Sequence, residues 1–186
     1  MITGILLAAG SASRFGSQKL LARLLDGRTV VEASMSTLHA ACGNVVAVTR
    51  RDPELIQLLE ARGCRVVINE QAAEGMGTSI AAGVNATGDA SGWLIALGDM
   101  PGIQVETVVA IADALRNGAR IAVPVMEGKR GHPVGFSASY GVQLQSLTGD
   151  TGAREIVNAD AAFVEEIRVV DAGIFLDIDT PADLER

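Results

Sequence analysis

The sequence predicts a three-layer α/β/α fold with a mostly parallel, twisted sheet. Short apolar runs rich in β-branched residues alternate along the chain with longer segments of helical periodicity. The apolar runs are nearly continuous, which is typical of strands that are buried on both faces of a parallel sheet. The 186 residues suffice for one such domain with a sizeable core.

The first part of the chain alternates between predicted strands and predicted helices. We expect the strands at residues 3–8, 45–49, 65–68, 93–97 and 120–125. We expect the helices between them at residues 29–41, 53–62, 78–86 and 105–117. Pro53 suits the first position of its helix, with Asp52 as the N-cap. Gly63 and Gly118 are typical of the residues that follow a helix end.

The pattern changes after residue 125. A polar loop at residues 127–133 comes first. We then expect strands at residues 134–137, 163–169 and 174–178, and helices at residues 140–147, 152–159 and 181–186. The strand at 163–169 is interpreted as an antiparallel edge strand or an excursion from the sheet. No repeat or flexible linker interrupts the sequence, so we predict a single domain over residues 1–186 with two parts, 1–125 and 126–186.

Composition and charge narrow the class of protein. The net charge is −7 at pH 7, and a nucleic-acid binder would need a basic face, although a few local cations suffice for a small anion. No apolar run approaches the length of a membrane span, and residues 1–10 are too short for a signal peptide. Cys42 and Cys64 make neither a disulfide framework nor a Cys-x-x-Cys metal pair. We expect a cytoplasmic protein without nucleic-acid or membrane partners.

A loop of small residues with two cations follows the first predicted strand. Residues 10–18 are mostly Gly, Ala and Ser, and the cations are Arg14 and Lys19. Small side chains let backbone N–H groups approach an anion, while the arginine fork and the mobile lysine charge neutralise it. The loop lacks the spacing of a P-loop, and Ala12 replaces the second glycine of a dinucleotide fingerprint. The loop therefore predicts a polyphosphate site of another kind; the alternative is that its cations face solvent.

Two aspartates stand at positions of interest for such a site. Asp99 follows the predicted strand at 93–97, at the edge of the sheet where open α/β folds bind ligands. Asp179 precedes Thr180-Pro181 near the end of the chain. The alternative role for each aspartate is a helix cap, before the fourth predicted helix and before the terminal one.

Residues 7–19 fit the pattern Leu-x-Ala-Gly-x-x-x-Arg-x-Gly-x-x-Lys. This pattern resembles the signature of the MobA-like NTP transferase family, which comprises nucleotidyltransferases with the glycosyltransferase-A-like fold and a Rossmann-like sheet. Gly-Asp-Met-Pro at 98–101 and Gly-His-Pro at 131–133 are similar to segments of its molybdenum cofactor cytidylyltransferase branch. Asp-x-Asp-Thr-Pro-x-Asp-Leu at 177–184 resembles the segment that closes the family's sequences. Phe15 departs from the family's usual methionine.

The resemblance implies roles for the residues around a nucleotide. Arg14 and Lys19 would hold the triphosphate, and with Asp99 they are the expected catalytic residues. Asp99 and Asp179 would bind Mg²⁺, which usually takes one or two carboxylates together with phosphates and waters. The expected nucleotide-binding residues are Leu7, Ala8, Ala9, Gly10, Ser11, Arg14, Lys19, Gly75 and Ser79. For the last two, an ordinary helix start is the alternative.

The acceptor site is expected in the second part of the chain. The resemblance implies that His132 faces the acceptor, that Arg130 binds an acceptor phosphate and that Arg154 reaches the site. A structural loop histidine and a solvent-exposed arginine are the alternatives. Residues 1–125 would then bind the nucleotide and residues 126–186 the acceptor.

The expected reaction transfers CMP from CTP to a phosphorylated small molecule and releases pyrophosphate. Ala9 favours CTP, because guanosine-using relatives commonly carry a second glycine there and the methyl group fills that space. Molybdopterin is the expected acceptor, and the resemblance suggests a molybdoenzyme or its maturation factor as a further partner. Three alternatives stay open: another phosphorylated acceptor, GTP as the donor, and a molybdenum cofactor carrier or insertion chaperone without turnover.

Overall fold

The computed structural model describes residues 1–10, 18–150 and 152–185. The strands are β1 (Ile2–Ala8), β2 (Val45–Thr49), β3 (Arg65–Ile68), β4 (Gly92–Leu97), β5 (Ile121–Met126), β6 (Lys129–Arg130), β7 (Val134–Ser137) and β8 (Val164–Arg168). The α-helices are α1 (Val30–Cys42), α2 (Pro53–Ala61), α3 (Met76–Asn85), α4 (Val105–Arg116), α5 (Gly141–Gln145) and α6 (Ala153–Ala159). Short 3-10 helices include Lys19–Leu21, Ala172–Phe175 and Pro181–Glu185.

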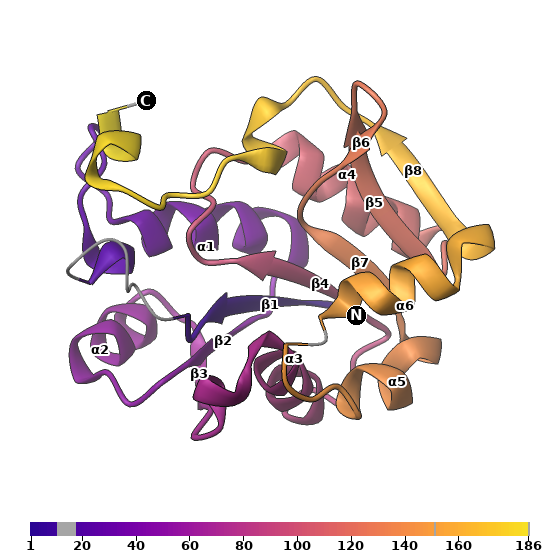
Figure 1. Ribbon diagram of the computed structural model, residues 1–186, viewed down its shortest axis with the longest axis horizontal. Coiled ribbons are helices and arrows are strands. Elements are labelled where there is room, and N and C mark those ends of the chain that lie inside the picture. Colours follow the sequence, from indigo (N-terminus) through magenta and orange to yellow (C-terminus); the bar gives the residue numbers. More distant parts are fainter. Residues whose placement is uncertain (11–17, 151, 186) are drawn as a thin grey trace.

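The strands form one sheet in the order β3-β2-β1-β4-β7-β5-β6, and β8 also pairs with β5 (Figure 1). Strands β1 to β4 are parallel, β7 runs antiparallel between β4 and β5, and β8 is parallel to β5. Among the described strands only β6 and β7 oppose the common direction, which confirms the mostly parallel sheet. The carboxyl ends of β1 and β4 point to the side of the molecule that the C-terminal segment crosses (Figure 1).

Helices cover both faces of the sheet, which gives the three predicted layers (Figure 1). Strand β1 shows how the side chains divide between the faces. Leu6 packs in the apolar cluster that includes α1 and α4, whereas Ile5 packs in the cluster that includes α3 and α5. Every residue of β1 is buried, so its apolar run follows from its central place in a sheet that is covered on both sides.

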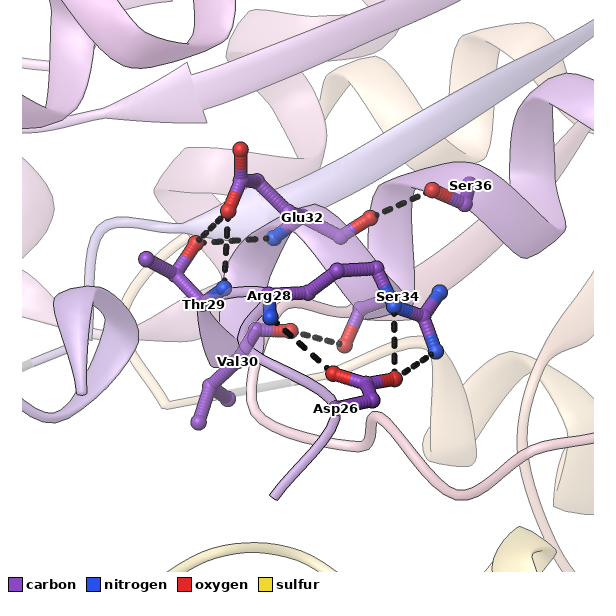
Figure 2. A network of polar contacts seen from close by, with 7 residues as sticks. All are labelled: Asp26, Arg28, Thr29, Val30, Glu32, Ser34 and Ser36. Atoms are coloured by element: carbon purple, nitrogen blue, oxygen red, sulfur yellow. Dashed lines mark hydrogen bonds and ion pairs between the residues drawn. The ribbon is translucent and has the colours of Figure 1, made fainter. Parts of the chain in front are cut away.

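Helix α1 begins with a buried capping box (Figure 2). The Thr29 hydroxyl accepts the N–H of Glu32, and the Glu32 carboxylate accepts the N–H of Thr29 at 2.7 Å. One turn later, the Ser34 hydroxyl donates to the carbonyl of Gly98 at 3.0 Å. Because Gly98 directly precedes Asp99, the start of α1 is tied to the loop that carries one of the predicted metal ligands.

The last part of the chain differs from the prediction. Residues 174–178 do not form a strand, and Ala172–Phe175 is a 3-10 helix instead. The chain closes in the 3-10 helix Pro181–Glu185 rather than an α-helix. The predicted polar loop contains the two-residue strand β6, and β8 pairs parallel to β5 rather than antiparallel.

Residues 171–179, here called the C-terminal strap, bond to loops rather than to a strand. The N–H of Ile178 donates to the carbonyl of Asp99 at 2.8 Å, and the carbonyl of Ile174 accepts the N–H of His132 at 3.0 Å. A Cβ on Gly173 would lie 2.1 Å from the Gly102 carbonyl oxygen, so the strap lies directly on the loop after β4. These contacts replace the strand pairing that the apolar sequence of the strap predicts.

No helix in the described part of the chain has both the length and the apolar character to cross a membrane.

Candidate active site

The ammonium group of Lys19 lies between two carboxylates. Its Nζ is 2.7 Å from Oδ2 of Asp99 and 3.4 Å from Oδ1 of Asp179. The Lys19 side chain is 13% exposed, whereas those of Asp99 and Asp179 are 22% and 43% exposed. The fold therefore brings together three of the predicted catalytic and metal-binding residues.

Backbone contacts fix the loop that carries Asp99. The N–H of Gly98 donates to the carbonyl of Leu7 at 2.9 Å, which continues the pairing of β4 with β1. A Cβ on Gly98 would lie 3.1 Å from the Leu7 carbonyl oxygen, so glycine permits this close approach. On the other side, Ile178 of the strap bonds to the carbonyl of Asp99. Asp99 is thus held by the sheet and by the strap together.

The helix-cap interpretation of Asp99 is wrong. The N-cap of α4 is Gln104, and its N–H is accepted at 2.9 Å by Asp171, which is 2% exposed. At the C-terminal 3-10 helix, the carboxylate of Asp183 accepts the N–H of Asp179 at 3.2 Å. The carboxylate of Asp179 faces Lys19 instead.

The two carboxylates also determine the charge state of Lys19. Burial lowers the pKa of this lysine, but the hydrogen bonds and negative charges of Asp99 and then Asp179 outweigh it. The net pKa is above its usual value, so Lys19 is a cation at neutral pH.

The oxygens of Asp99 and Asp179 fit a divalent cation. They already surround one positive charge, that of Lys19. Across the described ranges, no three His, Cys, Asp or Glu side chains form a group that could hold a metal ion. Two carboxylates, with phosphates and waters as the other ligands, are a common set for Mg²⁺. A metal here would therefore depend on a ligand that brings phosphate oxygens.

A cleft of about 520 Å³ opens beside Lys19 and Asp99. It is here called the nucleotide cleft, after the ligand that the sequence predicts there. It lies at the carboxyl ends of β1 and β4 and at the start of α3. The predicted nucleotide-binding residues that line it are Leu7, Ala8, Ala9, Gly10, Lys19, Gly75 and Ser79. The predictions for Ser11 and Arg14 lie outside the described residues.

Gly75 shapes one wall of the nucleotide cleft. It is the N-cap of α3 with φ of 127°, and a Cβ there would lie 2.2 Å from the backbone of Gly149. The loop at Gly149 therefore packs against the start of α3, and its neighbour Asp150 lines the cleft. The Ser79 hydroxyl accepts a hydrogen bond from Asn69 at 3.0 Å, so Ser79 both lines the cleft and stabilises the helix start.

Sequence reasoning missed Arg50. Its Nε donates to the carbonyl of Ala9 at 2.6 Å. It lines the nucleotide cleft and a neighbouring cleft of about 530 Å³ that also contains Arg51. The signal in the sequence is its place directly after the second predicted strand, which is the sheet edge that also carries Gly10 and Asp99.

A second cleft, of about 650 Å³, adjoins the first. It is here called the acceptor cleft, after the ligand that the sequence predicts there. The three predicted acceptor-binding residues, Arg130, His132 and Arg154, all line it. Leu7 and Leu97 line both clefts, so the two meet at the carboxyl ends of β1 and β4. The arrangement can hold two ligands side by side, with Lys19 and Asp99 on the nucleotide side.

His132 is held by the strap through its backbone, and its side chain has an unused polar atom. Its Nδ1 is buried and has no hydrogen-bond partner among the described residues. Burial lowers the pKa of His132, and the negative charges of Asp99 and Asp177 oppose this only in part. The imidazole is therefore neutral at pH 7.

Arg130 lies at the rim of the acceptor cleft. Its guanidinium forms an ion pair with Glu166 of β8 at 2.9 Å, and both side chains are exposed. An exposed pair of this kind is worth about 0–1 kcal/mol, so an anionic ligand can compete for the arginine at little cost. Arg154, at the start of α6, is exposed on the same cleft.

The fold and the site define a class of protein: an α/β domain that presents a lysine and two carboxylates beside a pair of adjoining clefts. Residues 4–164 match the MobA-like NTP transferase domain family, and the chain belongs to this family. It is a nucleotidyltransferase, as the resemblance at residues 7–19 predicts.

Individual relatives carry different names. The chain is 31% identical, over 195 aligned residues, to nicotine blue oxidoreductase from Paenarthrobacter nicotinovorans, with coverage of 100% of this chain and 95% of the relative. It is 40% identical over 47 residues to a molybdenum cofactor guanylyltransferase from Desulfosudis oleivorans, with coverage of 25% and 23%. The structure of Rv0371c from Mycobacterium tuberculosis in complex with manganese is similar with a TM-score of 0.80, 28% identity and coverage of 98% and 95%.

Proposed function

We propose that this nucleotidyltransferase transfers CMP from CTP to a phosphorylated small molecule, molybdopterin, and releases pyrophosphate in a reaction that needs Mg²⁺. The observation that carries this proposal is the contact of Lys19 with both Asp99 and Asp179 at the edge of the nucleotide cleft, next to the acceptor cleft. A cation beside two carboxylates suits a triphosphate and the metal ion that accompanies it.

The residues at the site would act by binding and orientation. Lys19, with Arg14, neutralises the phosphates, and the wall formed by Ala8–Gly10 and Gly75 surrounds the nucleoside. Asp99 and Asp179 would hold Mg²⁺, which when bound supplies charge neutralisation at the phosphates. Preorganised positive charge of this kind stabilises the charge that develops on the transferred phosphoryl group.

The acceptor phosphate itself is the nucleophile. One of its oxygens attacks the α-phosphorus of the triphosphate, and the bond to pyrophosphate breaks. A phosphate monoester has a second pKa of about 6, so it is already ionised at neutral pH and needs no general base. The neutral His132 would accordingly contact the acceptor as part of the wall of the acceptor cleft rather than take its proton.

The choice of CTP depends on the small residues at the end of β1. The methyl group of Ala9 narrows the cleft relative to glycine, which favours the smaller pyrimidine. The partial similarity to a guanylyltransferase supports GTP as the alternative donor. Thermal unfolding with each of the four nucleoside triphosphates and Mg²⁺ separates them, because a ligand that binds only the native state raises the apparent stability.

The acceptor, the partners and the division of the chain belong to the same proposal. Residues 1–125 would bind the nucleotide and residues 126–186 the acceptor, and the lining of the acceptor cleft by Arg130, His132 and Arg154 supports this. The product would pass to a molybdoenzyme or its maturation factor in the cytoplasm.

The decisive experiment is a pyrophosphate-release assay with CTP, GTP and phosphorylated acceptors, with and without Mg²⁺. Release with CTP and molybdopterin supports the full proposal. Release with another donor or acceptor replaces the substrate, and ligand binding without release identifies a carrier or insertion chaperone.

Similarity over the whole chain to nicotine blue oxidoreductase favours one second candidate, a redox activity in the same clefts. Its test is the change in the absorbance of nicotine blue when the protein and a two-electron donor are added. Turnover there, without pyrophosphate release from any triphosphate, would favour this candidate.

A further inference from the structure

Lys19 occupies the same carboxylates that a metal ion would use. Its ammonium lies 2.7 Å from Asp99 and 3.4 Å from Asp179, and only 13% of its side chain is exposed. The ammonium is therefore placed between the two acids, at the edge of the nucleotide cleft.

Ammonium and divalent cation cannot share this position. Two positive charges a few ångströms apart repel strongly where water is partly excluded. A metal ion that enters between Asp99 and Asp179 must displace Lys19, and the displaced ammonium then lies in a partly buried site without a counter-charge. Apart from Asp99, the described carboxylates in the two clefts that Lys19 lines are Asp150 and Asp52. They belong to different clefts, and Asp52 already accepts the N–H of Leu55 and a hydrogen bond from Gln18, so they do not form a comparable pair.

A triphosphate changes this balance. It carries several negative charges beside Lys19 and supplies oxygen ligands to the metal. Lys19 can then exchange its carboxylates for phosphates while the metal takes the carboxylates, so every charge remains paired.

We propose that Lys19 acts as a built-in counter-ion that keeps the divalent metal out until it arrives as the metal–nucleoside triphosphate chelate. This inference rests on the proposed function and deepens it: the substrate is the chelate, and the metal is not a resident cofactor. Thermodynamic linkage requires that whatever weakens the contact of Lys19 with the two aspartates strengthens binding of the bare metal by the same free energy.

The test measures Mn²⁺ alone, without nucleotide, by the electron paramagnetic resonance signal of free Mn²⁺. Lys19→Met removes the charge but keeps the apolar stem, and it is expected to bind Mn²⁺ about tenfold or more tightly than the unaltered protein. Lys19→Gln provides a second variant with a polar side chain. Circular dichroism and thermal unfolding establish that each variant is folded.

Lys129→Met is the matched control. The chain has two lysines, and Lys129 lies on the exposed strand β6, so this change alters the net charge equally without touching the two aspartates. Mn²⁺ affinity is expected to stay within about twofold of the unaltered protein, because an exposed charge at a distance is largely screened. Addition of Asp99→Asn to Lys19→Met is expected to remove the gain, which assigns the metal to this pair.

Equal Mn²⁺ affinity in the unaltered protein and both folded Lys19 variants overturns the inference, as does an equal gain in Lys129→Met. Failure of the proposed function is observed in a different experiment, the pyrophosphate-release assay with nucleotide and acceptor. The Mn²⁺ titration uses neither ligand, so the two failures can be distinguished.

Discussion

The backbone N–H of Ile178 donates a 2.8 Å hydrogen bond to the carbonyl oxygen of Asp99. Asp179 follows Ile178 directly, so this bond sets the two carboxylates on either side of Lys19. A residue near the end of the chain and a residue at the end of a central strand thereby become parts of one site.

Replacement of Lys19 or Asp99 by alanine tests the catalytic role of this site. We expect each change to lower kcat by about 10²–10³-fold, because each removes a charge that would be placed against the transferred phosphoryl group or its metal. Pyrophosphate release measures the effect. Asp113→Ala, an exposed aspartate on α4, is the control and should leave turnover intact. Near-normal turnover in Lys19→Ala or Asp99→Ala contradicts the assignment.

Arg50→Ala tests whether the arginine that sequence reasoning missed positions the nucleotide cleft. Loss of its hydrogen bond to the Ala9 carbonyl should raise the KM for the nucleotide about tenfold, with a smaller change in kcat, since a charge-assisted hydrogen bond is worth about 1.5–3 kcal/mol. Arg50→Lys should not restore it, because lysine lacks the planar fork.

The neighbouring Arg51 offers the control for this experiment. It is 75% exposed and pairs with Glu70, so Arg51→Ala should change KM less than Arg50→Ala. Equal effects of the two changes would indicate a general electrostatic influence rather than a specific contact.

The lowered pKa of Glu32 predicts that the free energy of unfolding depends on pH. The hydrogen bond from the Thr29 N–H lowers its pKa against the opposing effect of burial, and the Thr29 hydroxyl and Arg62 lower it further. Because the folded state prefers the carboxylate, its stabilisation is present above the unfolded pKa of about 4.3 and is lost as the pH falls through the lower, folded pKa.

Glu32→Gln keeps the capping hydrogen bond, because glutamine also serves at this position, but it removes the charge and the ion pair with Arg62. It should cost at most about 1 kcal/mol at pH 7 and flatten the loss of stability below about pH 5. Denaturant unfolding at several pH values measures both. Asp113→Asn is the control, because Asp113 is an exposed aspartate on α4, outside the capping box. An unchanged pH profile in Glu32→Gln would show that the capping box does not titrate as inferred.

Gly75→Ala tests the packing of the cleft wall. The new methyl group would meet the backbone of Gly149 in addition to the strain of a positive φ, so we expect a loss of about 2–4 kcal/mol and weaker nucleotide binding. Gly118→Ala has a φ of 103° and no atom within 4 Å, and it reports the strain of a positive φ without the contact, about 1 kcal/mol. Thermal unfolding compares the two, and equal losses would show that contact with Gly149 has little effect.

The apolar runs of the sequence predict most of the fold, and the polar residues that follow these runs predict the centre of the site. The apolar runs at β1 and β4 indicate buried strands of a parallel sheet, and polar residues that follow such strands gather at one edge of the sheet. The sequence therefore predicts that Lys19 and Asp99 belong to the same site. The strand order does not follow from the sequence. The placement of β7 between β4 and β5 depends on long-range pairing, which no local pattern predicts.

The strap and Arg50 show where local reasoning stops. Residues 174–178 have the apolar character of a strand, but their backbone partners belong to loops that only the folded chain brings near. Arg50 looks like an ordinary cation after a strand, and its role follows from one contact with the Ala9 carbonyl on the neighbouring strand. In both cases tertiary contacts override the sequence pattern.

Every strand of the described sheet is complete at Arg168, before the strap begins. The residues of the strap add no strand to the scaffold, yet they supply Asp179 and fasten the loops of Asp99 and His132. If the proposed function holds, substitutions in the strap can therefore change metal affinity and acceptor fit while the sheet beneath persists. Diversification of chemistry on a shared framework would then be concentrated in the final stretch of the polypeptide.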